Sequence, residues 1–197
     1  MIKVGLTGNI GSGKTTIAHL FEIMGIPIYN ADLRGRVISQ HSDVINEVVA
    51  VFGSTVITSE GLIDRKILAD IVFKDAEKLK QLNGIIHPRV RVDFIDWCNA
   101  QIVTPYVIHE SAILFESGLN TMFEKTILVT APDVLKLERV IRRDGVSKKD
   151  IINRIANQWP DSQKAILSDF IIVNDEETSL IEQVFAIHHM ILANYLL

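Results

Sequence analysis

The stretch that decides the fold is Gly8-Asn9-Ile10-Gly11-Ser12-Gly13-Lys14-Thr15, which fits the phosphate-loop pattern G-x-x-x-x-G-K-[ST] at every fixed position. Its glycines allow a tight turn whose backbone N–H groups point inward, where a side chain would block an approaching phosphate. Lys14 can reach the β- and γ-phosphates of a nucleotide, and the Thr15 hydroxyl can bind Mg²⁺. The stretch therefore predicts a nucleotide-phosphate site.

The segments on either side of this loop are those that a phosphate loop requires. The apolar run Ile2–Leu6 predicts a buried strand before it, and Thr15–Met24 has apolar residues at helical spacing after it. A helix that begins there points its positive N-terminal end at the loop. The local context therefore supports the nucleotide site.

Four further apolar runs have the length and β-branched content of buried parallel strands: Ile26–Tyr29, Tyr106–His109, Thr126–Val129 and Phe170–Val173. Helical patterns lie between and after them, including one from Pro132, expected at the first helical position, toward Arg143, and one over Leu180–Tyr195. Strands that alternate with helices predict an α/β fold with a doubly wound, mostly parallel sheet.

Two regions interrupt the alternation of strands and helices. Residues 32–103 have almost no strand signal and contain several helix-like segments, including Asp43–Phe52, Asp64–Phe73 and Pro88–Ile102. Residues 136–164 form a second, basic excursion. We therefore predict a core of residues 1–31, 104–135 and 165–197, a helical region over 32–103 and a lid over 136–164.

The composition is that of a globular protein. The chain has 197 residues, of which 48% are hydrophobic and 22% charged, which excludes disorder, collagen-like repeats and coiled-coil rods. It has no run near the ~18 apolar residues of a membrane helix and no signal-peptide pattern. The single cysteine, Cys98, excludes an internal disulfide. We therefore expect a cytoplasmic protein with no membrane partner.

The net charge of −4 is unevenly distributed. The span Val134–Lys164 holds eight basic and four acidic residues, so it carries +4 and leaves −8 for the rest of the chain. An acidic body argues against a nucleic-acid partner, whereas the basic span suggests a ligand with concentrated negative charge. A solvated helix face is the alternative. Arg139 and Arg143 are four residues apart, so both can face one ligand and stabilise the charge of a transferring phosphoryl group.

Carboxylates at the ends of two expected strands are candidates for chemistry. Asp32 follows the second strand and Glu110 the third, and ligands of such folds bind outside the carboxyl ends of the strands. Asp32 can orient or accept the proton of an attacking hydroxyl and help to hold Mg²⁺, and Glu110 can support Mg²⁺ through water. A helix N-cap is the alternative role for Asp32, and a cap or surface pair is the alternative for Glu110. Glu116 is equally ambiguous.

A GTPase switch is a rival interpretation of the phosphate loop alone. Asp32-Leu33-Arg34-Gly35 matches the D-x-x-G of such a switch, but it begins only 18 residues after Lys14, and the chain contains no N-K-x-D guanine reader. Both observations argue against a switch. The helical region also contains basic and histidine side chains that can bind phosphate, namely Arg36, Arg65, His87, Arg89 and Arg91.

Several short motifs follow one another in a specific order: Leu6–Thr16, Asn30-Ala31-Asp32 with Arg36, Gly61–Arg65, Ile86-His87-Pro88, Ile113–Leu119, Arg139, Arg143-Asp144-Gly145, Arg154, Gln158 and Ser168–Asn174. In this order they resemble the dephospho-CoA kinase family over nearly the whole chain. Three positions depart from the family pattern. Asn30 replaces the first acid of an Asp-Ala-Asp run, and Glu110 and Ala112 stand where the family usually has Asp and Pro.

The resemblance implies a P-loop NTPase fold with a helical CoA-side insertion and a small helical lid. It also implies transfer of the ATP γ-phosphoryl group to the ribose 3′-hydroxyl of dephospho-CoA, the last step of coenzyme A synthesis. We expect a monomer or a weak homo-oligomer. Two alternatives stay open: another small-molecule or nucleoside kinase on the same core, and a nucleotide-sensing binding module without transferase activity.

The candidate site residues fall into four groups. The catalytic candidates are Asp32, Lys14 and Arg143. The candidates for binding ATP are Gly11, Ser12, Gly13, Lys14, Thr15, Thr16, Arg139, Arg143 and Asn174. The candidates for binding the acceptor are Arg36, Arg65 and His87. The candidates for binding Mg²⁺ are Thr15, Asp32 and Glu110.

Overall fold

The computed structural model describes residues 1–101, 103–145, 151, 155 and 158–195. They fall into two compact units, which we name the core unit (Met1–Asn30 and Gln101–Leu197) and the helical unit (Ala31–Ala100). Arg154 and part of the predicted lid lie outside the described residues.

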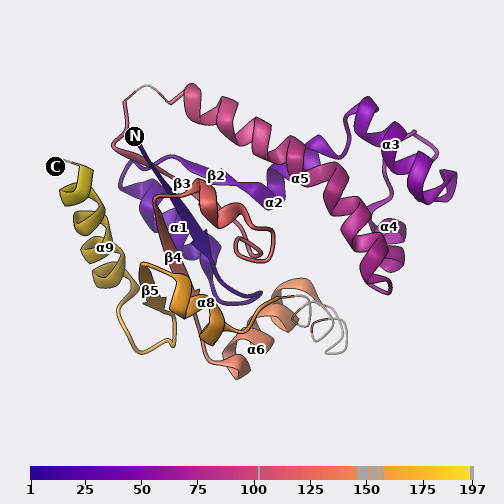
Figure 1. Cartoon of the computed structure of the whole chain (residues 1–197). Helices are drawn as coiled ribbons and strands as arrows, with labels where there is room; N and C mark the ends of the chain where they lie inside the picture. Colours follow the sequence, from indigo (N-terminus) through magenta and orange to yellow (C-terminus); the bar gives the residue numbers. More distant parts are fainter. Residues whose placement is uncertain (102, 146–150, 152–154, 156–157, 196–197) are drawn as a thin grey trace. The chain divides into compact units, whose positions relative to one another are not determined.

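A five-stranded parallel sheet forms the centre of the core unit (Figure 1). Its strands are β1 (Ile2–Thr7), β2 (Ile28–Asn30), β3 (Tyr106–Glu110), β4 (Lys125–Thr130) and β5 (Phe170–Val173). The order across the sheet is β2-β3-β1-β4-β5, and every neighbouring pair is parallel. The five predicted strands and the α/β class are confirmed.

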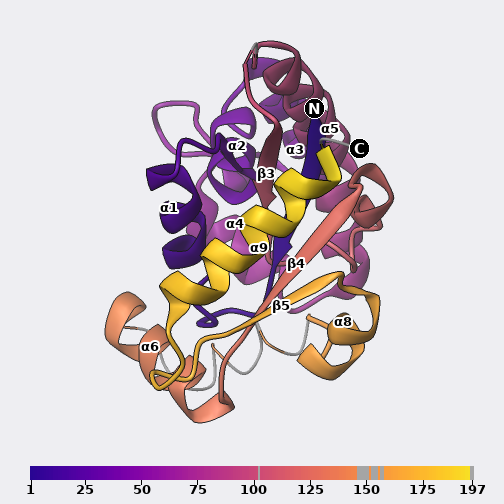
Figure 2. The same ribbon diagram turned by 90° about the vertical axis from the view of Figure 1, so that its left-hand side faces the viewer.

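One face of the sheet is covered by α1 (Lys14–Ile23) and α9 (Leu180–Tyr195), which pack against each other (Figure 2). Alternate strand residues point to this face, and residues three or four apart on a helix form its apolar stripe. The stripe of α9 is Val184, Ile187 and Ile191, all buried against the sheet. Each such side chain stabilises the fold by about 1.5–3 kcal/mol.

The opposite face of the sheet carries the segment after β3 and the helix α8 (Asp161–Leu167). Gly5 leaves room here, because a Cβ would lie 2.6 Å from the Leu114 side chain. His109 stacks on Tyr29 with 5.2 Å between ring centroids and lies 5.1 Å from the ring of Phe123. Burial lowers the pKa of His109 to about 4, so this histidine is neutral at pH 7. With both faces covered, the doubly wound architecture is confirmed.

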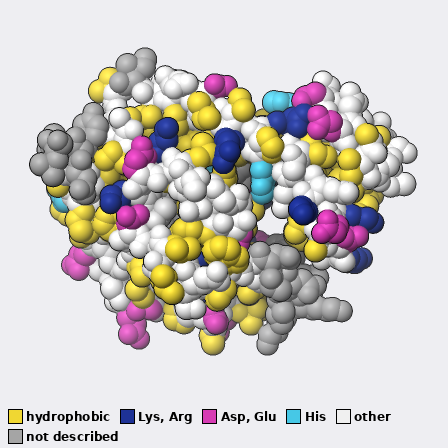
Figure 3. All heavy atoms as spheres, viewed as in Figure 1, with side chains coloured by type: hydrophobic (Ala, Val, Ile, Leu, Met, Phe, Trp, Pro, Cys, Tyr) yellow, Lys and Arg dark blue, Asp and Glu magenta, His cyan; other side chains and the backbone are white. Residues whose placement is uncertain are grey.

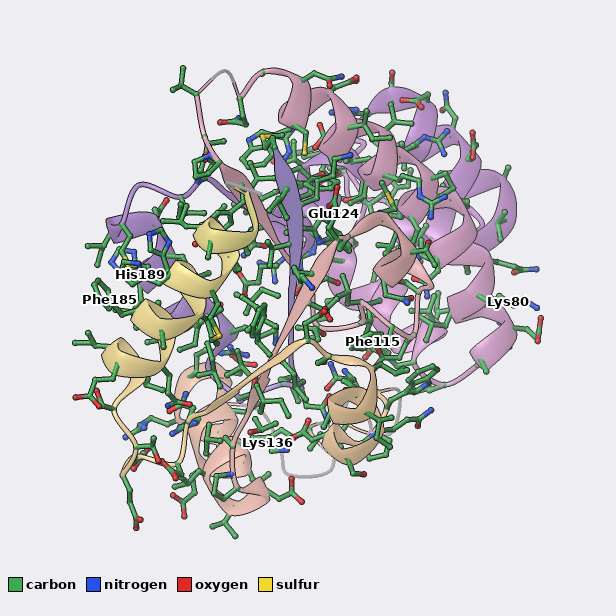
Figure 4. All side chains as sticks on the ribbon, turned by 60° about the vertical axis from the view of Figure 1, so that its left-hand side comes forward. Lys80, Phe115, Glu124, Lys136, Phe185 and His189 are labelled. Carbon is green, nitrogen blue, oxygen red and sulfur yellow. The ribbon has the colours of Figure 1, made fainter. Side chains whose placement is uncertain are left out.

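A buried lysine ties α6 (Asp133–Asp144) to α8. Lys136 projects from α6 toward α8 (Figure 4), and its Nζ donates to Asp133 Oδ1 at 2.8 Å and to Asp161 Oδ2 at 2.7 Å. Burial lowers the pKa of Lys136, but the hydrogen bonds to the two carboxylates outweigh it and raise the pKa overall. Pro132 lies at the N-cap of α6, one position before the expected one.

The helical unit contains α2 (Ala31–Ile38), α3 (Ser42–Phe52), the 3₁₀ turn η1 (Ser54–Val56), α4 (Arg65–Val72) and α5 (Ala76–Asn99). The helices α2, α3 and α4 all pack on α5. The predicted helices Asp43–Phe52 and Asp64–Phe73 are confirmed to within a residue at each end. Asp64 caps α4 by accepting from the backbone N–H groups of Lys66 and Ile67.

The helix expected over Pro88–Ile102 is longer than predicted. Helix α5 begins at Ala76, twelve residues earlier, and Pro88 lies in its interior. Proline is normally a signal for the start of a helix, which is why the sequence predicted a boundary there. The true start is marked by Asp75, whose carboxylate accepts from the backbone N–H groups of Glu77 and Lys78. Residue 102 lies outside the described residues.

Candidate active site

The phosphate loop joins β1 to α1, as predicted, and its glycines are required by their surroundings. The backbone angle φ is 80° at Gly11 and 95° at Gly13, values that residues with a side chain rarely adopt. A Cβ at Gly11 would collide with the backbone of Lys136 in α6, and a Cβ at Gly13 would collide with the Asn174 side chain after β5. Neighbouring elements therefore pack directly against the loop.

The side chain of Lys14 folds back over Gly8 and Asn9, the first residues of the loop. The buried Lys14 Nζ donates to the Gly8 carbonyl at 2.8 Å and to the Asn9 carbonyl at 3.5 Å. The first turn of α1 contains no acidic residue, so its positive end is not neutralised from within the helix. An ammonium group and a helix N-terminus that meet at one loop form a site suited to phosphate.

Two adjoining pockets open beside the loop. The larger, of about 400 Å³, is lined by Gly13, Thr16, Arg139, Asn174, Glu176, Thr178 and Leu180. The smaller, of about 240 Å³, is lined by Gly11, Gly13, Lys14, Thr15, Thr16, Arg139, Val140 and Arg143. The structure thus brings together every candidate nucleotide residue except Ser12, which is buried within the loop.

Arg139 connects α6, the phosphate loop and the segment after β5. Its Nη1 donates to the Gly11 carbonyl at 3.5 Å, and its Nη2 donates to the Asn174 carbonyl and Asn174 Oδ1, both at 3.2 Å, and to Glu176 Oε1 at 3.0 Å. Asn174 Nδ2 donates to the Ser12 carbonyl at 2.8 Å. Arg139 and Asn174 therefore form a hydrogen-bonded rim of the larger pocket, and Arg139 also lines the smaller one.

Arg143 lines the smaller pocket and is paired with its chain neighbour. Its Nε donates to Asp144 Oδ1 at 2.7 Å and its Nη2 to Asp144 Oδ2 at 3.1 Å. The hydrogen bond to Asp144 raises the pKa of Arg143, which keeps the guanidinium charged. The Arg143 side chain is 63% exposed. It could therefore leave Asp144 and bind another anion without moving out of a packed core.

The sequence analysis missed three residues of the larger pocket: Glu176, Thr178 and Leu180. Glu176 has φ 70°, in the left-handed region that non-glycine residues seldom adopt. These residues follow β5, just as Asp32 follows β2 and Glu110 ends β3. The rule that ligands bind outside the carboxyl ends of strands could therefore have found them.

Glu110 lies at the centre of a polar cluster where β1, β2 and β3 end. Its Oε1 accepts from the Thr15 hydroxyl at 2.8 Å, and its Oε2 accepts from Asn30 Nδ2 at 2.7 Å. The sheet register pairs both Leu6 and Asn30 with Glu110, which explains why the three strands bring these groups together. Two of the three positions that depart from the family pattern, Asn30 and Glu110, are thus hydrogen-bonded partners.

The donor atoms of this cluster fit Mg²⁺. Magnesium prefers oxygen ligands and is usually held by one or two carboxylates together with substrate phosphates. The Thr15 hydroxyl and the Glu110 carboxylate are such ligands, and they lie in contact at the start of α1. The arrangement is suited to a cation that also binds nucleotide phosphates.

The other candidates lie in the helical unit. Asp32 is in the first turn of α2, past the N-cap position that was its alternative role. Burial, and to a lesser extent the charge of Arg36, lower the pKa of Arg65. Burial likewise lowers the pKa of His87 on α5. Arg89, also expected to bind phosphate, is paired instead with Asp43 and Glu47.

The described residues contain no group of three or more His, Cys, Asp or Glu side chains that could hold a metal ion. Lys and Arg side chains are scattered on the face shown in Figure 3, several of them beside acidic side chains. His188 Nδ1 lies 2.6 Å from the Tyr106 hydroxyl, and His189 packs on the ring of Phe185 (Figure 4).

No helix of the described part is both long and apolar enough to cross a membrane.

Comparison with known proteins decides the family. The family model described as dephospho-CoA kinase matches residues 2–179. The chain belongs to the dephospho-CoA kinase family. A dephospho-CoA kinase of Bacteroides fragilis is 37% identical over 183 residues, which cover 93% of this chain and 89% of that protein.

Solved structures show the same relationship. A crystal structure of a Thermus thermophilus protein matches with a TM-score of 0.83 and 31% identity, covering 98% of this chain and 97% of that one. A dephospho-CoA kinase from Campylobacter jejuni matches with a TM-score of 0.67 and 26% identity, covering 96% of each chain. Membership of the dephospho-CoA kinase family confirms the predicted P-loop kinase fold and the phosphotransferase class, and it implies the use of ATP.

Proposed function

We propose that this chain transfers the γ-phosphoryl group of ATP to the ribose 3′-hydroxyl of dephospho-CoA, giving coenzyme A and ADP. The observation that carries the proposal is a complete phosphate loop, with Lys14 and Thr15 in place, in a chain that matches the dephospho-CoA kinase family over residues 2–179. The reaction is the last step of coenzyme A biosynthesis, and we expect it to take place in the cytoplasm with a monomer or a weak homo-oligomer.

The two pockets beside the loop suit the two parts of ATP. The smaller pocket, over the loop and the start of α1, would hold the phosphates through backbone N–H groups of residues 11–16 and through Lys14. The larger pocket would hold the nucleoside, with Asn174 and Arg139 at its rim. Arg143 would exchange Asp144 for phosphoryl oxygens when ATP is bound.

Mg²⁺ would be held by Thr15 and Glu110, with Asp32 as the third candidate. Bound there, the ion would neutralise charge on the β- and γ-phosphates. The clustered hydroxyl and carboxylate oxygens support this assignment. Asn30 keeps Glu110 turned toward Thr15, because it donates to the other carboxylate oxygen.

The chemical roles follow from charge and position. Asp32 would accept or orient the proton of the attacking 3′-hydroxyl, whose oxygen forms the new bond to phosphorus as the bond to ADP breaks. Lys14 and Arg143 would stabilise the negative charge that spreads over the transferring oxygens. Asp32 lies two residues after Asn30, so it follows directly on the strand end that contacts Glu110.

The acceptor would be held by the helical region, residues 32–103. The positive charge of Arg36 lowers the pKa of Arg65, and two like charges that influence each other in this way would favour an anion such as the pyrophosphate of dephospho-CoA. His87 would add a neutral hydrogen-bonding group, because burial lowers its pKa. Residues 136–164 would act as the lid, and residues 1–31, 104–135 and 165–197 as the nucleotide-binding core.

A coupled assay of ADP release tests the proposal. Dephospho-CoA should support turnover, whereas adenosine, shikimate and gluconate should not, and ³¹P NMR should show a new 3′-phosphate monoester on the product. Turnover with one of the other acceptors instead would assign a different small-molecule kinase. ATP binding without turnover on any acceptor would indicate a nucleotide-sensing module.

A further inference from the structure

Two residues between α6 and α8, Gln158 and Trp159, contact the phosphate loop directly. The Ile10 backbone N–H donates to Gln158 Oε1 at 3.0 Å, and Asn9 Nδ2 donates to the Trp159 carbonyl at 3.1 Å. Asn9 and Ile10 occupy variable positions of the phosphate-loop pattern, so the pattern itself does not account for these contacts. The first half of the loop is therefore held from outside.

Gln158 and Trp159 are themselves fixed by a buried ion pair. Lys164, whose side chain is fully buried, donates through Nζ to Glu116 Oε1 at 2.8 Å, and the same oxygen accepts from the Trp159 backbone N–H at 2.8 Å. Lys164 Nζ and Gln158 Nε2 also donate to the Ala112 carbonyl, at 3.0 and 3.4 Å. Breaking such a pair leaves a buried charge uncompensated, so this anchor resists displacement.

The peptide bond between Asn9 and Ile10 transmits the contact with Gln158 to Lys14. Its N–H end donates to Gln158, and its carbonyl end accepts from the Ser12 backbone N–H at 3.0 Å and from Lys14 Nζ at 3.5 Å. Because a peptide unit is planar, the direction of its N–H fixes the direction of its carbonyl. Gln158 therefore orients a carbonyl group on which the Lys14 ammonium rests.

Lys14 indicates which phosphate depends on this arrangement. Its ammonium lies at the Gly8–Asn9 end of the loop, and the lysine of a phosphate loop reaches the β- and γ-phosphates. Gly13, near the other end of the loop, lines both pockets, including the larger one that extends away from Lys14 toward Thr178 and Leu180. The end of the loop that Gln158 braces is thus the end that faces the terminal phosphate.

We propose that Gln158 is a positioning residue for the terminal phosphoryl group. By orienting the Asn9–Ile10 peptide, and through it Lys14, it makes the site bind a nucleoside triphosphate more tightly than a diphosphate. The proposal rests on the proposed function for the nucleotide, but not for the acceptor.

The test compares the affinities for ATP and ADP of the full-length protein and of Gln158→Ala, by calorimetry with Mg²⁺ and without an acceptor. Loss of one orienting hydrogen bond should raise the Kd for ATP by about 5- to 10-fold. The Kd for ADP should rise less, by about twofold or less, because ADP keeps the β-phosphate but lacks the γ-phosphate, so only one of the two contacts of Lys14 is affected. The ratio of the two constants is therefore the measured quantity.

Gln40→Ala is a matched control, because Gln40 braces a backbone in the same way. Its Oε1 accepts from the Ile63 N–H at 3.0 Å and its Nε2 donates to the Ile63 carbonyl at 3.4 Å, within the helical unit. It should lower the Tm to a similar extent and leave the ratio unchanged. Gln158→Met keeps the length of the side chain without the hydrogen bonds, so it should reproduce the changed ratio with less loss of packing.

Equal weakening of ATP and ADP in Gln158→Ala and Gln158→Met would show a general structural brace and would overturn the proposal, as would unchanged affinities. Failure of the proposed function looks different. In that case the wild-type protein would not turn over dephospho-CoA, while the change in the ratio would persist in the variants.

Discussion

The two units of the chain hold their candidate site residues in different ways. In the core unit the candidates bind one another: Lys14 contacts the Gly8 carbonyl, and Arg139 contacts Asn174. In the helical unit the charge of Arg36 lowers the pKa of Arg65, and neither side chain forms an ion pair with a described residue. The proposed nucleotide side is thus organised by its own contacts, whereas the two charges on the proposed acceptor side have no ion-pair partner among the described residues.

Arginines elsewhere in the helical unit show that this difference is specific. Arg34 forms a two-point hydrogen-bonded pair with Asp93, and Arg89 pairs with Asp43 and with Glu47, at 2.6 Å from the latter. These arginines are neutralised within the unit and contribute to its structure. We therefore predict that variants of the candidate residues in the core unit weaken nucleotide binding. Variants of Arg36 and Arg65, which form no ion pair with a described residue, should weaken binding of the acceptor alone.

The largest effect is expected for Lys14→Ala. Loss of the ammonium removes charge stabilisation at the β- and γ-phosphates, so kcat/KM should fall by at least about 10³-fold, and ATP should bind more weakly. The ADP-release assay and an ATP titration measure the two effects. A kcat/KM equal to that of the wild type would contradict the assignment of the phosphate loop.

Asp32→Asn should have the next largest effect, and on a different quantity. Removing the group that accepts or orients the hydroxyl proton should lower kcat by about 10²-fold while leaving ATP affinity largely unchanged. Steady-state kinetics with a separate binding titration distinguish the two. Near-normal turnover would remove Asp32 from the chemistry.

Arg36→Ala and Arg65→Ala test the acceptor side. Each should raise the KM for dephospho-CoA by about tenfold or more, as expected for a hydrogen bond to a charged group, with the KM for ATP unchanged. Arg89→Ala is the control: it removes an equivalent charge that is already paired, so it should lower the Tm and leave both KM values near those of the wild type. A similar rise in the KM for dephospho-CoA in all three variants would contradict the proposal that Arg36 and Arg65 bind the acceptor while the paired Arg89 does not.

The sequence predicted the phosphate loop and the parallel strands well because their determinants are local. The loop, its strand and its helix are contiguous, and the five strands have strong apolar patterns, so the order of elements could be read along the chain. The contacts of Asn30 with Glu110 and of Ile10 with Gln158 could not be predicted, because they join residues 80 and 148 positions apart. The start of α5 was missed because Pro88 gave a stronger signal than the Asp75 cap.

The smallest effect is expected at Asn30, where the chain departs from its family. Asn30→Asp replaces the donor to Glu110 Oε2 with a second anion, so Glu110 should turn away from Thr15 and kcat/KM should fall by about fivefold. Because the new charge attracts cations, raising the Mg²⁺ concentration should restore part of the loss. Kinetics over a range of Mg²⁺ concentrations measure both.

Asn30→Ala separates the two causes, because it removes the donor without adding a charge. Its kcat/KM should fall slightly and should not recover at higher Mg²⁺ concentration. If Asn30→Asp were instead as active as the wild type at every Mg²⁺ concentration, the orientation of Glu110 would not depend on Asn30. The polar cluster at the ends of β1, β2 and β3 would then be set by Thr15 alone, and the core unit would be less tightly organised than its contacts indicate.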